Sequence, residues 1–357
     1  MRPAYATIHL GHLTHNYHLI CQMAQQNPVI AVIKANAYGH GLIPVGQTLY
    51  QEGCRDFAVT DAEEGTSLRA EMKTDANIIL LSGLFDQNDA LLCQQHQLTP
   101  VISESIQLQH LLHANFMGEV WIKVDTGMSR IGVADLNPFI KQVQDSPIHL
   151  AGIMSHLACA DTPEHPLNQT QIEAFKHIQR NTNVAAYSLL NSAGIIAFSD
   201  VVTGAVRPGI ALYGIEPIPS RPIGLKPVMQ LSSRVLQVRP IQAGESVSYG
   251  ATWSAKQDMH VAVVALGYAD GLPRLLSNQS EVLHASGKLP IVGRVCMDYC
   301  LVAASEKQVH AGDEIIFFGF DDAPYVDTIA KQCQSIAYEI FTSISPRVAR
   351  RYIGETL

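Results

Sequence analysis

The sequence has little of what marks several large classes of protein. Its seven cysteines are odd in number and include no Cys-x-x-Cys pair, which argues against a disulfide framework and against a zinc site. Charged residues make up only 16% of the chain, no lysine- or arginine-rich run is present, and the net charge is −8. Nucleic acids and anionic membranes are therefore disfavoured as partners, and a small molecule is expected.

Other signals are also missing. No apolar run approaches the length that crosses a bilayer, and the N-terminal segment has no basic patch followed by an apolar core. We therefore expect a protein of the reducing cytoplasm. No Gly-x-Gly-x-x-Gly motif indicates a dinucleotide site. His12, His15 and His18 are spaced by three rather than by the four typical of a metal-binding helix, so no metal site is predicted.

What the sequence does have is enough apolar residues for two domains, since 47% of its 357 residues are hydrophobic. Short apolar runs alternate with amphipathic stretches up to about residue 215, which is typical of strand–helix units around a parallel sheet. The runs are Val29–Ile33, Phe57–Val59, Ile78–Leu81, Thr99–Ile102, Val120–Val124, Leu150–Ile153, Tyr187–Leu190 and Val202–Val206. They predict a (β/α)8 barrel, with an open doubly wound sheet as the alternative.

Helices are predicted between the runs, and the pattern becomes β-rich after Pro227. The helices are Asp61–Glu71, Ser103–Asn115, Pro138–Asp145 and Asn168–Asn181; the later strands are Leu231–Val238, His260–Leu266, Leu289–Val295 and Glu314–Phe318, followed by a helix at Val326–Tyr338. We expect a barrel domain at residues 1–225 and a mostly-β domain at residues 226–357. A first strand at about residues 3–9 can join the second domain.

The most unusual polar residue is Lys34, which ends the first barrel run in AVIKANAYGHG. Barrel enzymes build their sites at the carboxyl ends of the strands. A lysine at the edge of an apolar pocket loses hydration, its pKa falls, and its neutral amine can form a Schiff base with a carbonyl. A structural salt bridge is the alternative explanation for this lysine taken alone.

Further polar residues follow other predicted strands, namely Arg130, His156, Ser192 and Arg207. Barrels often bind phosphate after strands seven and eight, where Ser192, Gly194, Gly209 and Ile210 lie here. A phosphate site at one end, a lysine at the other and an arginine near a ring nitrogen would together fit pyridoxal phosphate (PLP).

These segments resemble the alanine racemase family. AVIKANAYGHG is similar to the PLP-attachment motif of that family, and VDTGMSRIG, NSAG, VRPGIALYG, VSYGATW, LGYADG and GRVCMDY follow in the family's order. The resemblance implies a PLP-dependent racemase with a (β/α)8 barrel and a mostly-β C-terminal domain. It would interconvert L- and D-alanine with two bases and supply D-alanine for peptidoglycan.

By this resemblance, Lys34 carries PLP and is the base on the D-alanine face, while Tyr249 of a partner subunit is the base on the L-alanine face. A planar carbanion inverts when it is reprotonated from the opposite side, so two bases suit the reaction. A phenol titrates near pH ~10, and His156 with Arg207 would help Tyr249 to ionise. Arg207 would also face the pyridine nitrogen, which would stay unprotonated because a guanidinium keeps its proton.

The resemblance also implies roles for supporting residues. Arg130 and the backbone of Met297 would hold the substrate carboxylate and the cofactor side, and the phosphate would be held by Tyr38, Ser192, Gly209 and Ile210. Lys123 matches a lysine often carbamylated in the family, with an unmodified buried ion pair as the alternative. The substrate entrance would be lined by Asp161, Tyr268, Arg274 and Arg294, with Asp298 in support. Pro346 departs from the family, because many members have a phosphate-contacting tyrosine there.

A homodimer with shared active sites follows, because Tyr249 lies in the second domain and is not expected to reach its own barrel. Two alternatives remain within the PLP enzymes: a broad-specificity or serine racemase of the same fold, and a decarboxylase on a similar plan, which would need a longer chain. A non-catalytic PLP carrier is the alternative from another class, but such carriers are typically lone barrels.

Overall fold

The structure is a computed structural model that describes residues 2–25, 27–72, 75–201, 204–304 and 308–354. The chain forms two compact units. The barrel unit comprises Leu13–Ala37 and Leu42–Leu225, and the β unit comprises Met1–His12, Tyr38–Gly41 and Lys226–Leu357. No helix of the described chain is long and apolar enough to cross a membrane.

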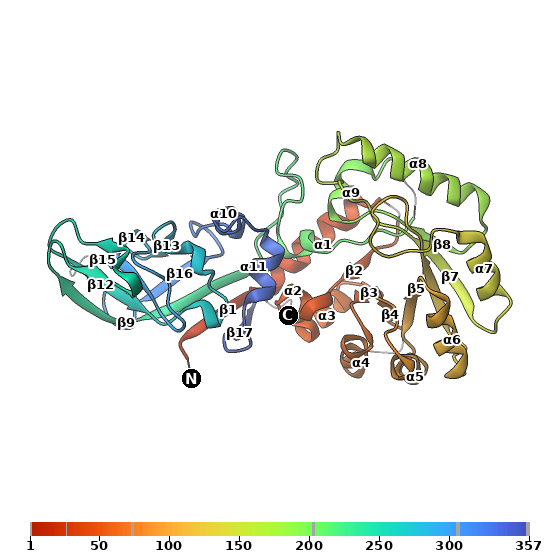
Figure 1. The fold of residues 1–357 in the computed structure, drawn as a ribbon, viewed down its shortest axis with the longest axis horizontal. Coiled ribbons are helices and arrows are strands. Elements are labelled where there is room, and N and C mark those ends of the chain that lie inside the picture. The colour runs from red at the N-terminus through yellow and green to blue at the C-terminus, as the bar shows by residue number, and fades with distance from the viewer. Residues whose placement is uncertain (1, 26, 73–74, 202–203, 305–307, 355–357) are drawn as a thin grey trace. The chain divides into compact units, whose positions relative to one another are not determined.

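Seven parallel strands form the sheet of the barrel unit and are hydrogen-bonded in chain order from β2 to β8. They are β2 (Ile30–Val32), β3 (Asp56–Val59), β4 (Asn77–Leu80), β5 (Thr99–Ile102), β6 (Glu119–Lys123), β7 (His149–Met154) and β8 (Ala186–Ser188). Figure 1 shows the sheet curled, with helices on its outside. Apolar side chains on both faces of such strands are buried, which explains why the strands read as continuous apolar runs. The predicted barrel-type α/β fold is confirmed.

The predicted eighth strand, Val202–Val206, is wrong as a regular strand. Residues 202 and 203 lie outside the described residues, and the segment that follows makes isolated bridges with the chain before β2 and after β8. The N–H of Ile30 donates to the Val206 carbonyl at 2.8 Å. Pro208 has no N–H, so a ladder cannot continue there. The bridges still bring Arg207 beside the first and last strands of the sheet.

Helices connect the strands, and the four helices predicted between them are present with small shifts at their ends. Asp61 opens α4 by accepting the N–H of Glu64, and Pro166 lies in the first turn of α8. The helices are α1 (Leu10–Met23), α2 (Lys34–Tyr38), α3 (Leu42–Gln51), α4 (Ala62–Glu71), α5 (Gln87–His96), α6 (Ser105–His113), α7 (Leu136–Gln144), α8 (Pro166–Asn181) and α9 (Ser192–Phe198).

An eight-stranded sheet forms the β unit, with the order β14-β13-β16-β9-β1-β17 and with β12 between β9 and β15. The N-terminal β1 pairs antiparallel with β9 and parallel with β17, so both ends of the sequence share one sheet. The strands are β1 (Ala4–His9), β9 (Met229–Ile241), β12 (Met259–Val264), β13 (Glu281–His284), β14 (Gly287–Pro290), β15 (Cys300–Ala304), β16 (Glu314–Phe318) and β17 (Ala349–Ile353). β10 (Ser246–Val247) pairs with β11 (Trp253–Ser254) in a separate hairpin.

Two predictions in this unit are wrong. The strand expected at Leu289–Val295 ends early, because β14 stops at Pro290 and Gly293 has a φ of 71°. The helix expected at Val326–Tyr338 is two helices, α10 (Val326–Gln332) and α11 (Ala337–Ser343). Gln334 between them has a φ of 53°, which ends a right-handed helix.

Candidate active site

Lys34 lies two residues after the end of β2, and the turn that follows it is left-handed. Ala35, Asn36 and Ala37 have φ values of 53°, 54° and 53°. Non-glycine residues in this region cost about 1–2 kcal/mol each relative to the right-handed helix. Such a run persists only where the surroundings hold it, and strained backbone of this kind is concentrated at functional sites.

Four cationic side chains of the barrel unit interact electrostatically, namely Lys34, Lys123, Arg130 and Arg207. Burial, and then the charge of Arg130, lowers the pKa of Lys34. Burial together with Arg207, Arg130 and Lys34 lowers the pKa of Lys123 to about 7. The pKa of the buried Arg207 is lowered to about 10 by burial and by Arg130. The site is therefore strongly electropositive and suited to an anionic ligand.

Arg207 fixes the protonation of His156. Its Nη2 atom lies 3.3 Å from Nδ1 of His156 and also donates to the Leu189 carbonyl at 3.3 Å. A guanidinium only donates, so Nδ1 accepts and the ring proton lies on Nε2. Burial, and then the charge of Arg207, holds the pKa of His156 well below its usual value, so the ring is neutral.

Among the described residues, the Nε2 atom of His156 has one close polar neighbour, the side-chain nitrogen of Asn191 at 3.3 Å. This amide nitrogen is a donor, because the oxygen of the same amide accepts the N–H of Gly194 at 2.9 Å. Two donors cannot bond each other, so this contact does not satisfy the Nε2–H group. The imidazole N–H thus remains able to donate to a further acceptor.

Ser192 provides a second unused donor. Its buried hydroxyl oxygen accepts the N–H of Gly209 at 2.9 Å and that of Ala211 at 3.3 Å. Within the described part of the chain, no group accepts the hydroxyl proton of Ser192. Ile210 lies between these two donors, so the predicted phosphate residues Ser192, Gly209 and Ile210 are brought together.

Lys123 and Arg130 lie at the end of β6 and in the loop after it. Lys123 is only 8% exposed, and no described residue accepts a hydrogen bond from its amine. The loop is shaped by Asp125, whose Oδ1 accepts the N–H groups of Gly127, Met128 and Ser129 at 2.8–3.2 Å. Arg130 follows this turn and is exposed.

Tyr249 occupies a strained corner of the β unit. Ser248, Gly250 and Ala251 around it have φ values of 65°, 73° and 47°. The Ser248 hydroxyl donates to the carbonyl of Arg294 at 2.6 Å, and a Cβ atom on Gly250 would lie 2.8 Å from the Arg294 guanidinium. The corner presents Tyr249 outward, with 70% of its surface exposed.

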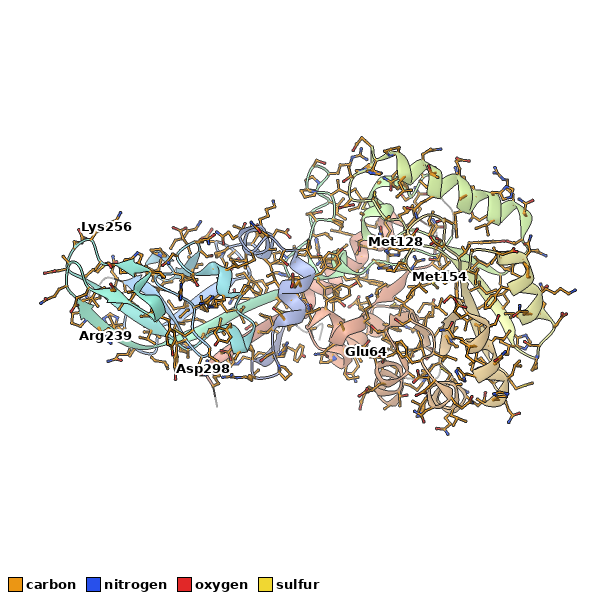
Figure 2. The ribbon with its side chains drawn as sticks, in the orientation of Figure 1. Glu64, Met128, Met154, Arg239, Lys256 and Asp298 are labelled. Carbon is orange, nitrogen blue, oxygen red and sulfur yellow. The ribbon has the colours of Figure 1, made fainter. Side chains whose placement is uncertain are left out.

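The other predicted residues of the β unit adjoin this corner. The N–H of Ala269 in the turn Tyr268–Asp270 donates to the Met297 carbonyl at 3.0 Å. Arg294, Met297 and Asp298 lie on one short segment of chain; Asp298 is labelled in Figure 2. The turn Arg274–Leu276 is joined to the same segment, because the hydroxyl of Ser277 accepts the N–H of Val295 at 3.0 Å.

Three further predicted positions are described by their local surroundings. Asp161 is exposed in the loop after β7, and three carbonyls of that loop accept from the buried amide of Asn168. Tyr38 belongs to the β unit, where its buried ring lies 5.8 Å from that of Tyr338. Pro346 is exposed near the start of β17. No group of three or more possible metal ligands occurs among the described residues.

Comparison with known protein families identifies both parts of the chain. Models of the alanine racemase N-terminal and C-terminal domains match residues 8–217 and 228–352. The chain belongs to the alanine racemase family. The alanine racemase of Stutzerimonas stutzeri is 36% identical over 368 residues, covering 99% of this chain and 100% of that protein.

Solved alanine racemases have the same fold. The biosynthetic alanine racemase from Pseudomonas aeruginosa superposes with a TM-score of 0.91 at 35% identity, covering 99% of this chain and 100% of that one. The alanine racemase from Bartonella henselae with covalently bound pyridoxal phosphate gives a TM-score of 0.89 at 33% identity, covering 98% and 99%. The resemblance inferred from the motifs is confirmed.

Two polar residues of this alanine racemase family member were missed by the sequence analysis. Glu64, labelled in Figure 2, bonds the backbone beside Lys34, and Gln171 bonds the loops after β6 and β7. The acidic residue three places after Asp61 was a signal for Glu64, since it is typical of a helix start. The signal for Gln171 was an amide at helical spacing from Asn168 and Phe175 on a buried face.

Proposed function

We propose that this chain is a PLP-dependent alanine racemase that interconverts L- and D-alanine and supplies D-alanine for peptidoglycan. The observation that carries the proposal is the group of four cations that includes Lys34, at the carboxyl ends of the barrel strands. An anionic cofactor and an anionic substrate both suit that group. Family membership points to the same reaction.

The residues fit PLP as the cofactor. The unused hydroxyl proton of Ser192 and the backbone at Gly209 and Ile210 would hold its phosphate, with Tyr38 as a further contact. Lys34, with its lowered pKa, would attach the cofactor covalently. Arg207 would donate to the ring nitrogen and, as a guanidinium, would not transfer its proton.

When bound, PLP withdraws electrons from the amino acid and makes its α-proton more acidic. The residues of the chain then place and move that proton. The amine of Lys34 would take or return it on one face, and the phenol oxygen of Tyr249 would do so on the other. Arg130 would hold the substrate carboxylate in its donor fork, with the backbone of Met297 nearby.

His156 would assist Tyr249. A phenolate is a stronger base than a phenol but forms only near pH ~10 in water. The Nε2–H group of His156, held in that tautomer by Arg207, could donate to the phenolate oxygen. Arg207, hydrogen-bonded behind the imidazole, would keep that N–H group as the donor.

A homodimer would complete the site, with Tyr249 reaching the barrel of the partner subunit. Support comes from aromatic and apolar side chains left exposed on the β unit: Tyr249 is 70% exposed, Met297 53% and Tyr268 43%. Exposed groups of this kind often mark an interface. Tyr268, Arg274, Arg294 and Asp161 would line the substrate entrance of the assembled dimer, with Asp298 in support.

Borohydride reduction tests the proposal. Reduction of the PLP-loaded protein should abolish its visible absorption and attach the cofactor to Lys34, located by peptide mass spectrometry. Tyr249→Phe should keep that labelling and lose racemisation by about 100-fold or more, as expected for loss of an acid–base group. Tyr325→Phe, another exposed tyrosine of the β unit, is the control and should retain activity.

Two outcomes would refute the proposal. Labelling at a lysine other than Lys34 would show that Lys34 is not the cofactor-binding residue. Labelling of Lys34 without any alanine turnover would indicate a PLP carrier. A panel of L-amino acids, serine included, then measures the substrate range.

A further inference from the structure

The left-handed turn after Lys34 is held by one carboxylate. Oε1 of Glu64 accepts the N–H of Asn36 at 2.8 Å, and Oε2 of the same group accepts the N–H of Thr60 at 3.0 Å. Thr60 directly follows β3, the neighbour of β2 in the sheet. Glu64 therefore ties the strained turn to the end of the adjacent strand.

The side chain of Asn36 anchors the other side of the turn. Its Oδ1 atom accepts the N–H of Leu42, the first residue of α3, at 2.8 Å. Hydrogen bonds to a charged acceptor are stronger than neutral ones. Of the two anchors, the one made by Glu64 is the charged one.

Glu64 also opposes the cations electrostatically. Arg130 lowers the pKa of Lys34 and Glu64 raises it. Two other titratable groups, Lys123 and His156, interact electrostatically with Lys34. The charge of Lys34 contributes to lowering the pKa of each. Among the described residues, Glu64 is the one carboxylate that acts on the amine.

We propose that Glu64 is a positioning residue for Lys34. Its carboxylate holds the turn that aims the amine, and its charge sets how readily the amine keeps a proton among the surrounding cations. The proposal rests on the proposed function in taking Lys34 as the cofactor-binding base. It adds a residue that would act through the turn and through its charge on Lys34.

The test compares Glu64→Gln with Glu63→Gln. Glu63 is the preceding residue of α4, is exposed, and makes no hydrogen bond or ion pair with a described residue. Both substitutions remove one negative charge from the same helix turn. A difference between them therefore reports the position of the Glu64 carboxylate and not merely the change in net charge. Glu64→Asp keeps the charge on a shorter side chain.

The first measurement uses the full-length chain freed of cofactor. Lys34 is labelled with an amine-reactive anhydride across a range of pH, and its modification is quantified by peptide mass spectrometry. In Glu64→Gln the midpoint should move to lower pH by about half a unit or more, because a charged neighbour that favours the protonated amine is gone. Glu63→Gln and Glu64→Asp should stay close to the unsubstituted midpoint.

The second measurement uses the PLP-loaded enzyme. In Glu64→Gln, kcat should fall about tenfold in both directions because the amine is less well aimed. The acid limb of D-alanine turnover should move to lower pH, since Lys34 must be neutral to accept a proton. The alkaline limb of L-alanine turnover should move the same way, since there Lys34 must carry the proton.

Several results would overturn the assignment. One is an unshifted midpoint in Glu64→Gln, even with reduced stability or activity, because Glu64 would then be structural only. Another is an equal shift in Glu63→Gln. If Glu64→Gln does not fold, Glu64→Asp decides, because it keeps the negative charge. A labelling midpoint of Lys34 that is lower in Glu64→Asp than in the unsubstituted chain would contradict the proposal. If the unsubstituted enzyme does not racemise alanine, the proposed function fails, while the labelling midpoint still decides the role of Glu64.

Discussion

Burial among like charges changes the chemistry open to Lys123. With a pKa of about 7, a large fraction of its amine is neutral at pH 8. The burial that lowers this pKa also leaves the amine without an acceptor among the described residues. A neutral amine can add to carbon dioxide and release one proton to solvent to form a carbamate, and the new negative charge would then lie among Arg130, Arg207 and Lys34.

We therefore predict that Lys123 is carbamylated, and that the modification is lost as the pH falls through about 7, where the amine becomes protonated. Isotopically labelled bicarbonate should give a carbamate signal in the carbon NMR spectrum of the enzyme. Lys123→Met should remove that signal and raise KM for alanine by about tenfold, because Arg130 loses its orienting partner. A signal that persists in Lys123→Met would contradict the assignment.

Sequence analysis identified residues whose chemistry follows from their side-chain type and their position after a predicted strand. It did not identify residues whose role depends on the backbone conformation around them. Lys34 was identified because a lysine at the end of a buried strand is unusual. Glu64 was missed because its function follows from the left-handed turn at residues 35–37, and alanine has no preference for that backbone. The roles of Lys34 and Tyr249 stay predictions until they are tested.

Helix α8 shows how a whole element positions a site. Its buried face carries Gln171, which is fully buried. The amide nitrogen of Gln171 donates to the His156 carbonyl at 2.9 Å and to the Thr126 hydroxyl at 3.4 Å, and its oxygen accepts the N–H of Ala158 at 2.8 Å. One side chain thus joins the helix to the loops after β6 and β7.

We expect Gln171→Leu to lower the free energy of unfolding by about 2–3 kcal/mol, because the His156 carbonyl and the Ala158 N–H in the loop after β7 lose their partner and the bond to the Thr126 hydroxyl is lost. PLP affinity and kcat should fall with it, since His156 would be less well held. Gln169→Leu, on the exposed face of the same helix, is the control and should change stability by less than about 0.5 kcal/mol. Urea denaturation of both variants measures the difference in the free energy of unfolding. Equal losses of stability in the two variants would show that the hydrogen bonds of Gln171 do not stabilise the fold.

Elements with a strong apolar pattern were predicted well. Elements that are interrupted by a proline or by a residue with left-handed backbone were not. The first seven barrel strands coincide with buried apolar runs. The eighth differs because Pro208 cannot donate to a ladder, and the expected helix at Val326–Tyr338 breaks at a left-handed Gln334. Such interruptions depend on single backbone conformations, which hydrophobic periodicity does not report.

At the scale of the molecule, the two proposed bases belong to different units: Lys34 to the barrel unit and Tyr249 to the β unit. If the active site is shared between subunits, two inactive variants should complement each other. A heterodimer of Lys34→Ala with Tyr249→Phe contains one site with both defects and one site with none.

Mixing the two variants under conditions that exchange subunits should therefore restore roughly a quarter of the normal activity, since about half of the dimers are mixed and each has one intact site. Each variant alone, refolded in the same way, is the control and should stay inactive. Activity that does not recover, although mass spectrometry shows mixed dimers, would mean that each subunit uses its own tyrosine.

The pairing of β1 with β17 has a consequence for synthesis. Within this sheet β1 comes before and β17 after every other strand in the sequence, so a nascent chain on the ribosome cannot pair the two until residues 349–353 emerge. The barrel, whose strands pair in order of translation, has no such delay. Termination of the chain before β17 would leave one edge of β1 without a partner strand.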